Sequence, residues 1–136
     1  VSGSLDQSIR IWNLGSEICS ATLLGHTSGV WSLCRISESR IASGSGDKSV
    51  KVWDLTSQSC LATLTGHRGD VLAVCRMNSS VICSGSGDRT IRVWDLSFQT
   101  CTATLDGHAD SVQALCWVTG STLASSSNDC SVGIWS

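Results

Sequence analysis

Histidine, serine and aspartate recur together along the chain at a spacing that could support nucleophilic catalysis. In such a set the serine is the nucleophile, the histidine is the general base and the aspartate orients the histidine. Three sets follow one another at intervals of 41 residues: His26, Ser43, Asp47; His67, Ser84, Asp88; and His108, Ser125, Asp129. A catalytic constellation is needed once, and the sequence contains no Gly-x-Ser-x-Gly elbow. We therefore expect a structural role for these residues, no catalytic residue and no enzymatic activity.

The eight cysteines lack the spacing of a metal or redox site. Two series of three lie 41 residues apart: Cys19, Cys60, Cys101 and Cys34, Cys75, Cys116. No Cys-x-x-Cys pair is present, so we expect no metal and no cofactor. Cysteines that repeat with the strands are expected to pack as small buried hydrophobic residues, with all eight thiols reduced. Eight free thiols favour a reducing compartment, which predicts an intracellular protein, cytoplasmic or nuclear.

The charge of the chain argues against two classes of partner. The net charge is −2, and no block of like charge occurs in the 136 residues. A nucleic-acid or membrane surface requires clustered Lys and Arg, so we expect neither as a partner. No apolar run reaches the roughly 18 residues that a membrane span requires.

A period of 41 residues organises the whole chain. Residues 25–65 and 66–106 align without a gap, with 21 identities in 41 positions. The period is marked by Gly-His dipeptides and by tryptophans, which are Gly25-His26, Gly66-His67, Gly107-His108, Trp12, Trp53, Trp94 and Trp135. Such self-similarity is typical of an architecture built from stacked copies of one unit.

Each period contains the signals of four short strands. In the first complete period, we predict strands over residues 30–35, 40–45, 49–54 and 60–64. Gly46-Asp47 is expected to form a tight turn, because glycine tolerates positive φ and aspartate can bond its own backbone. Four antiparallel strands make one blade, and one blade cannot bury its faces alone, so neighbouring blades must stack. The sequence therefore predicts an all-β protein.

The Gly-His and Trp-Asp dipeptides at this spacing resemble those of the WD-repeat β-propellers, over the whole chain. The resemblance implies a hydrogen-bonded tetrad of His, Ser, Asp and Trp in each repeat. Here the tetrads are His26, Ser43, Asp47, Trp53; His67, Ser84, Asp88, Trp94; and His108, Ser125, Asp129, Trp135, while the partial first repeat keeps Ser2, Asp6 and Trp12. A buried histidine needs partners for both ring nitrogens, and a carboxylate and a hydroxyl supply them.

The expected architecture is a β-propeller of four-stranded antiparallel blades, here an arc of about 3.5 blades. Roughly fourteen strands are predicted, which amounts to about three and a half four-stranded blades. Closed propellers contain about 4–8 blades. The predicted division is residues 1–24 as a partial blade with a connecting strand, 25–65 and 66–106 as repeats, and 107–136 as a repeat that lacks its last strand. We expect this arc to be part of a longer closed ring.

Candidate partner-binding residues come from the resemblance, because partners of such propellers often engage the upper rim of the central channel. That rim corresponds to the residue before each turn aspartate and to residues at the start of the innermost strand. The candidates are Gly46, Gly87, Asn128, Trp31, Leu72, Gln113 and Asp70, with Gly29 and Ser111 beside them. None of these is Arg or Lys, so the blades offer no arginine fork for a phosphopeptide. An exposed Trp31 is the kind of residue that fills a partner's hydrophobic pocket, although it could equally pack on its own loop.

The sequence favours a non-catalytic scaffold or adaptor that binds other proteins or peptides through the loops of a propeller face. Stacked repeats offer no intrinsic chemistry, so function depends on the side chains that the loops project. The compact repeats resemble those of ubiquitin-ligase substrate receptors and signalling adaptors. The alternative is a propeller domain of a larger enzyme complex, such as a ubiquitin ligase or a kinase.

Overall fold

The computed structural model describes residues 1–118 and 120–136, which form fourteen β-strands and no helix. The strands are β1 (Ser2–Gly3), β2 (Ile9–Asn13), β3 (Ile18–Leu23), β4 (Val30–Arg35), β5 (Arg40–Ser45), β6 (Val50–Asp54), β7 (Ser59–Leu64), β8 (Val71–Arg76), β9 (Val81–Ser86), β10 (Ile91–Asp95), β11 (Thr100–Leu105), β12 (Val112–Trp117), β13 (Leu123–Ser127) and β14 (Val132–Trp135). The all-β prediction is confirmed. In the first complete period, two strands have the predicted bounds, and the other two differ by one residue at their starts.

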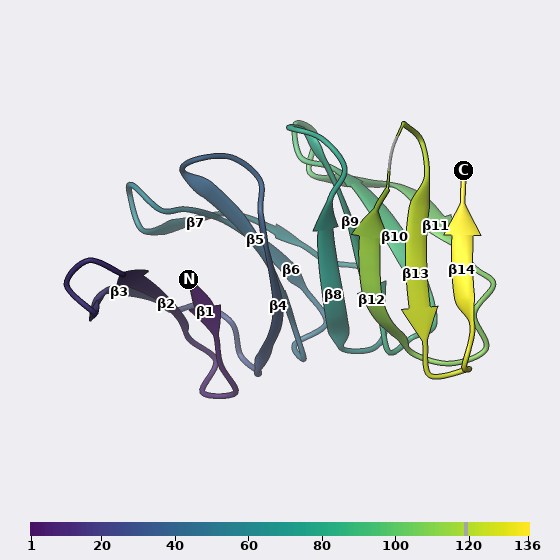
Figure 1. The fold of residues 1–136 in the computed structure, drawn as a ribbon, viewed down its shortest axis with the longest axis horizontal. Coiled ribbons are helices and arrows are strands. Elements are labelled where there is room, and N and C mark those ends of the chain that lie inside the picture. The colour runs from purple at the N-terminus through teal and green to yellow at the C-terminus, as the bar shows by residue number, and fades with distance from the viewer. Residues whose placement is uncertain (119) are drawn as a thin grey trace.

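Four antiparallel sheets stand side by side in an arc (Figure 1). Their strand orders are β1-β2-β3, β4-β5-β6-β7, β8-β9-β10-β11 and β12-β13-β14. Contacts among the second, third and fourth sheets run mainly through their first strands, because β4 lies against β8 and β8 lies against β12. The predicted open arc of propeller blades is therefore confirmed, with three strands in each end sheet and four in each of the two between them.

The turn between the second and third strands of each blade is built differently from its sequence-based explanation. Asp47 does bond its own backbone, because its Oδ1 accepts the Ser49 N–H at 3.0 Å and the Ser49 hydroxyl at 2.6 Å. The positive φ, however, falls on Lys48 at 68°, and not on Gly46. The turn chemistry of the aspartate was predicted correctly, and the role given to the glycine was wrong.

Gly46 is instead required because neighbouring side chains leave no room for a Cβ. A Cβ at this position would lie 2.7 Å from the Ser28 hydroxyl and 3.1 Å from Nε1 of Trp31. The same reason explains the glycines inside the second strands of the blades. A Cβ on Gly44 or Gly85 would lie 2.7 or 2.6 Å from a valine of the next sheet. These glycines therefore permit the close approach of neighbouring blades.

The hydrophobic core is divided into three clusters, one at each junction between sheets. The junction of the second and third sheets is the largest, and it includes Val50 and Leu64 from one side and Val71, Ile82 and Trp94 from the other. The remaining two clusters join the first sheet to the second and the third to the fourth. Each blade thus buries its faces only against its neighbours, as stacking repeats do.

The expectation that both periodic cysteine series are buried is wrong. Cys19, Cys60 and Cys116 are exposed, and their other counterparts in the two series are half-buried. The only fully buried cysteine among the described residues is Cys83, which lies outside both series. The reason is positional: Cys19 and Cys60 lie on outermost strands, and Cys116 belongs to the last sheet, which has no neighbour on one side. All eight thiols are free.

Candidate functional site

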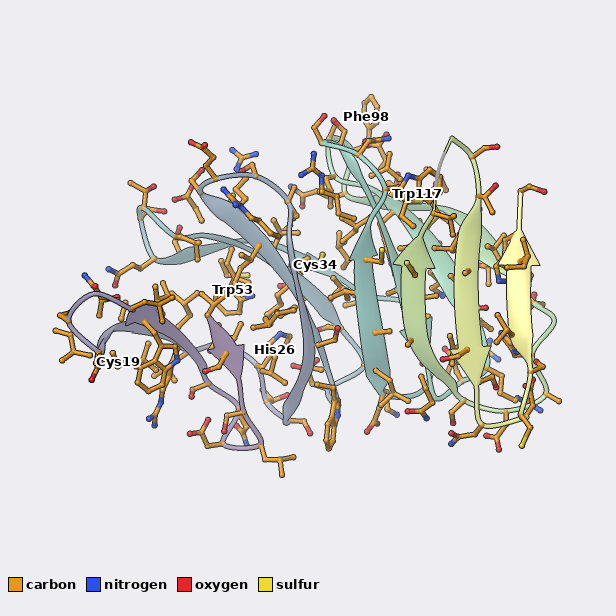
Figure 2. All side chains as sticks on the ribbon, in the orientation of Figure 1. Cys19, His26, Cys34, Trp53, Phe98 and Trp117 are labelled. Carbon is orange, nitrogen blue, oxygen red and sulfur yellow. The ribbon has the colours of Figure 1, made fainter. Side chains whose placement is uncertain are left out.

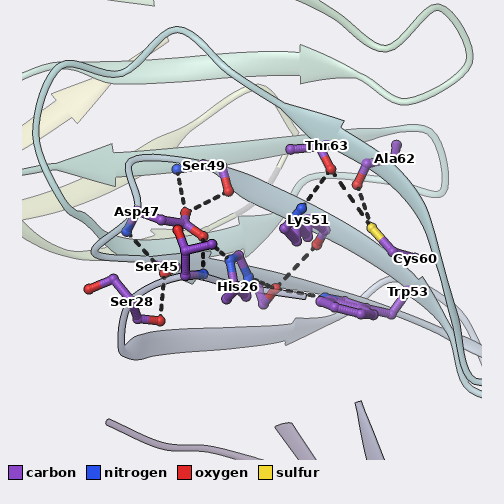
Figure 3. A network of polar contacts seen from close by, with 12 residues as sticks. His26, Ser28, Ser45, Asp47, Ser49, Lys51, Trp53, Cys60, Ala62 and Thr63 are labelled. Carbon is purple, nitrogen blue, oxygen red and sulfur yellow. Dashed lines mark hydrogen bonds and ion pairs between the residues drawn. The ribbon is translucent and has the colours of Figure 1, made fainter. Parts of the chain in front are cut away.

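The first complete blade joins the four predicted tetrad residues in one hydrogen-bonded network. Nδ1 of His26 lies 2.7 Å from Oδ2 of Asp47, and Nε2 lies 2.7 Å from the Ser43 hydroxyl. The indole N–H of Trp53 donates to the same hydroxyl at 2.8 Å. Figure 3 shows the His26 ring between Asp47 and Trp53. The network links the loop before β4 to the β5–β6 turn and to β6.

The two following blades repeat this geometry almost unchanged. His67 lies 2.8 Å from both Asp88 and Ser84, and Trp94 donates to Ser84 at 2.8 Å. The last sheet has corresponding distances of 2.9, 2.7 and 2.8 Å among His108, Asp129, Ser125 and Trp135. The structure therefore brings together all three predicted sets.

The partial first blade keeps part of the network without a histidine. Trp12 still donates to the Ser2 hydroxyl at 2.9 Å, and Asp6 still accepts from Ser8. Without a histidine over it, Trp12 is 42% exposed, whereas Trp53 is 1% exposed. The first sheet has neither this histidine nor a fourth strand, and its tryptophan is correspondingly more exposed.

Burial favours the neutral form of His26 and His67. Loss of hydration lowers the pKa of His26 and of His67, and this effect outweighs the hydrogen bonds to Asp47 and Asp88, which act in the opposite direction. A neutral ring that donates from Nδ1 to the carboxylate accepts at Nε2 from the serine hydroxyl. That tautomer satisfies every member of the network.

The tetrad carboxylates are held in their charged form. Burial alone would raise the pKa of Asp47, but hydrogen bonds from Ser49 and His26 outweigh it and hold the pKa at about 2. In Asp88, burial is likewise outweighed by hydrogen bonds, chiefly from Thr90, and the pKa is lowered. The hydroxyl of Ser131 is the main cause of the lowered pKa of Asp129.

These shifts predict that the fold loses stability in two steps as the pH falls. Unfolded histidine titrates near about 6.5 and unfolded aspartate near about 3.9. A group with a lowered pKa in the folded state contributes stability above its unfolded pKa, and that contribution is lost as the pH falls through the folded pKa. We expect the midpoint of urea unfolding to decrease first below about pH 6.5, from His26 and His67, and again below about pH 4, from the three aspartates. A midpoint that stays constant from about pH 7.5 to 5 would contradict the buried neutral histidines.

Serine, histidine and aspartate lie in the order of a hydrolytic triad, but the site gives a substrate no access. Ser43 is 0% exposed, and its oxygen already accepts the Trp53 N–H. A nucleophile must reach the substrate with its oxygen, and this oxygen is enclosed. The geometry therefore supports a structural role, in which these residues hold the loops and strands of a blade together, rather than acyl transfer.

The candidate partner-binding residues lie on one face of the arc, at the same end of each blade. We call this end the loop face; it consists of the turns at 46–49, 87–90 and 128–131 and the inter-sheet loops at 24–29, 65–70 and 106–111. The two kinds of loop are joined by backbone hydrogen bonds, from Gly46 to Gly29 at 3.0 Å, Gly87 to Asp70 at 2.9 Å, and Asn128 to Ser111 at 3.0 Å. The candidates thus line successive blades rather than one compact pocket.

Three candidates do meet at the junction of the second and third sheets. A Cβ built on Gly46 would lie 3.1 Å from Nε1 of Trp31 and 3.3 Å from Oδ2 of Asp70. Trp31 is 48% exposed, and the structure gives its indole N–H no hydrogen-bond partner among residues 1–118 and 120–136. Leu72 is half-buried on the next blade, and Gln113 is exposed on the last.

Sequence reasoning missed Leu5. It precedes Asp6 as Gly46 precedes Asp47, so it occupies the same rim position in the partial first blade. Leu5 is 71% exposed, and a Cβ on Gly29 would lie 2.9 Å from Cδ2 of Leu5 and 3.8 Å from Cζ2 of Trp31, so both side chains lie beside this glycine. Aligning the partial blade by its turn aspartate would have identified it. Leu5 and Trp31 together form an apolar pair on the loop face.

The part of the chain that the structure describes holds no group of three or more His, Cys, Asp or Glu side chains placed to bind a metal ion. Nor does it include a helix with the length and apolar character needed to cross a membrane.

One family model matches the chain three times. It is described as WD domain, G-beta repeat, and it matches residues 17–54, 58–95 and 99–136. Each match contains the outermost strand of one sheet followed by the first three strands of the next. The three matches together cover most of the 136 residues. No curated protein matches the chain.

Proposed function

Because the chain belongs to the WD40 family, whose repeats generally mediate protein–protein interaction, we propose that it is a non-catalytic scaffold that binds a protein or peptide through its loop face. The observation that carries this proposal is the exposed apolar pair of Leu5 and Trp31, with the carboxylate of Asp70 near the Trp31 indole N–H. An apolar anchor within a polar rim is the usual composition of a binding hot spot.

The partner that fits this surface presents an apolar side chain and a nearby hydrogen-bond acceptor or cation. The apolar side chain would pack on Leu5 and on the Trp31 ring, and the free indole N–H of Trp31 would donate to the acceptor. Asp70 would pair with a cationic group of the partner. No arginine or lysine lies among the rim candidates, so recognition does not depend on a phosphate.

An intracellular location is part of this proposal. It is supported by the eight free cysteines, several of which are exposed and would be oxidised readily outside a reducing compartment.

We expect Trp31→Ala to abolish partner binding without loss of stability, because Trp31 is exposed and lies outside the hydrophobic clusters. The matched control is Phe98→Ala, because Phe98 is 78% exposed but lies on the β10–β11 turn at the opposite end of the blades (Figure 2). The measurement is affinity capture from cell extract, with quantitative mass spectrometry of the wild-type and both variant chains. Proteins retained by the wild-type and Phe98→Ala chains should be missing from the Trp31→Ala capture. Because recognition does not depend on a phosphate, treatment of the extract with phosphatase should not change this result. If Phe98→Ala loses these proteins and Trp31→Ala keeps them, binding occurs at the opposite end.

A further inference from the structure

Two cysteines face each other across the first hairpin of the third sheet. In the antiparallel pairing of β8 with β9, Cys75 lies directly opposite Cys83. The Cys83 thiol donates to the backbone carbonyl of Cys75 at 3.5 Å, so its sulfur already lies over the neighbouring strand. Both side chains belong to the cluster between the third and fourth sheets, so they lie on the same face of the hairpin.

This pairing occurs in only one of the three corresponding hairpins. The residue opposite Cys34 is Ala42, and the residue opposite Cys116 is Ala124. Only the third sheet has a cysteine at this position, where the second and fourth sheets have the smaller alanine. The second thiol is therefore not required for packing, and its position provides a direct partner for Cys75.

The two thiols have different environments. Cys83 is 0% exposed, whereas Cys75 is only half-buried. The side-chain interaction of the Cys83 thiol with the Cys75 thiol, with help from the backbone amide of Trp117, lowers the pKa of Cys75. The same interaction, together with burial, raises the pKa of Cys83. Cys75 is therefore the member of the pair that ionises and that small molecules reach, and Cys83 holds its proton.

We propose that Cys75 is an oxidative modification site for hydroperoxides and that Cys83 resolves the oxidised form into a cross-strand disulfide. The Cys75 thiolate attacks the outer oxygen of the hydroperoxide, the O–O bond breaks, and the departing alkoxide or hydroxide takes up the proton that Cys75 released. Cys75 is then a sulfenic acid. The Cys83 sulfur attacks the Cys75 sulfur, the S–O bond breaks, and the oxygen leaves as water with the Cys83 proton. Two thiols and one hydroperoxide thus give one disulfide, one alcohol or water, and one further water.

The fold provides the distance that this bond needs. Directly opposite residues of antiparallel strands have Cα atoms about 4.5–5.5 Å apart, which lies within the roughly 4.4–6.8 Å that disulfides span. The bond would close a short loop around residues 76–82 and join two strands that are already paired. Reduction by a thiol restores both cysteines, so the modification is reversible.

The test oxidises the reduced 136-residue chain with hydrogen peroxide, then alkylates and digests it with trypsin. Cleavage after Arg68, Arg76 and Arg89 places the two cysteines on separate peptides, 69–76 and 77–89. When the oxidised chain is taken from the monomer band of a non-reducing gel and digested, these two peptides should be linked by a disulfide. Titration of the unfolded chain should show a loss of two thiols from the original eight.

Cys83→Ala copies the residue found at positions 42 and 124, and it should abolish the linked peptides while Cys75 becomes trappable by dimedone as a sulfenic acid. Cys75→Ser should abolish both signals, and Cys34→Ala, the matched control, should keep the linked peptides. The proposal is overturned if both cysteines stay alkylatable while exposed Cys130 or Cys19 oxidises. It is equally overturned if the linked peptides form only after the chain has been unfolded.

Discussion

His67→Ala should lower the free energy of unfolding by about 2–3 kcal/mol, because it leaves buried polar groups without partners. Ser84 is 0% exposed, and its hydroxyl would lose its acceptor while the Trp94 N–H still donates to it. Asp88 would keep the backbone amide of Arg68 but lose the imidazole. For a chain of this size, the loss corresponds to a decrease in melting temperature of roughly 5–10 °C.

The matched control for this substitution is Arg68→Ala. Arg68 is adjacent and exposed, and it contributes its backbone N–H to Asp88, which alanine keeps. We expect its melting temperature to stay within about 2 °C of the wild type, as for most surface substitutions. Calorimetry of both variants at equal protein concentration measures the difference. If His67→Ala melted like the wild type but lost a measurable turnover, the tetrads would be catalytic after all.

The second large effect is on association. We expect a polypeptide of residues 1–136 to self-associate at micromolar concentration, because both end sheets present an unpaired strand edge and an apolar flank. Val132 and Ile134 on β14 are 70% and 66% exposed, and a hollow lined by Leu115 and Val132 opens on the same sheet. The chain has no proline, the residue that would hinder strand pairing at either edge. Sedimentation velocity should therefore show species larger than the 14.3 kDa monomer.

A charge on the exposed edge should reverse this behaviour. Ile134→Lys places a cation on β14, and edge lysines prevent strand-to-strand pairing. Leu14→Lys is the control, because Leu14 is 89% exposed but lies on the β2–β3 turn and not on a flank. We expect more monomer for Ile134→Lys and no change for Leu14→Lys. A wild-type chain that sediments as a stable monomer would mean that the arc covers its own edges.

The sequence alone predicts the local structure of this protein well. The 41-residue period carries the strand alternation, the turn aspartates and the His, Ser, Asp and Trp of each tetrad in one register. The tetrad partners lie within one blade, at most 27 positions apart, as His26 and Trp53 are. Each set recurs with the same spacing, so the repeat itself indicates which residues meet.

Contacts between blades were decided only by the tertiary structure. A repeat position has the same backbone in every blade, but its burial depends on the neighbour that covers it. For this reason Cys34 is half-buried and Cys116 is exposed, although the two cysteines occupy the same position in the 41-residue repeat. The position of Trp31, near Leu5 on one side and Asp70 on the other, likewise involves three blades, and no period in the sequence marks it. Periodicity determines which residues a blade presents, whereas the close stacking of blades, through glycines such as Gly44, determines what those residues touch.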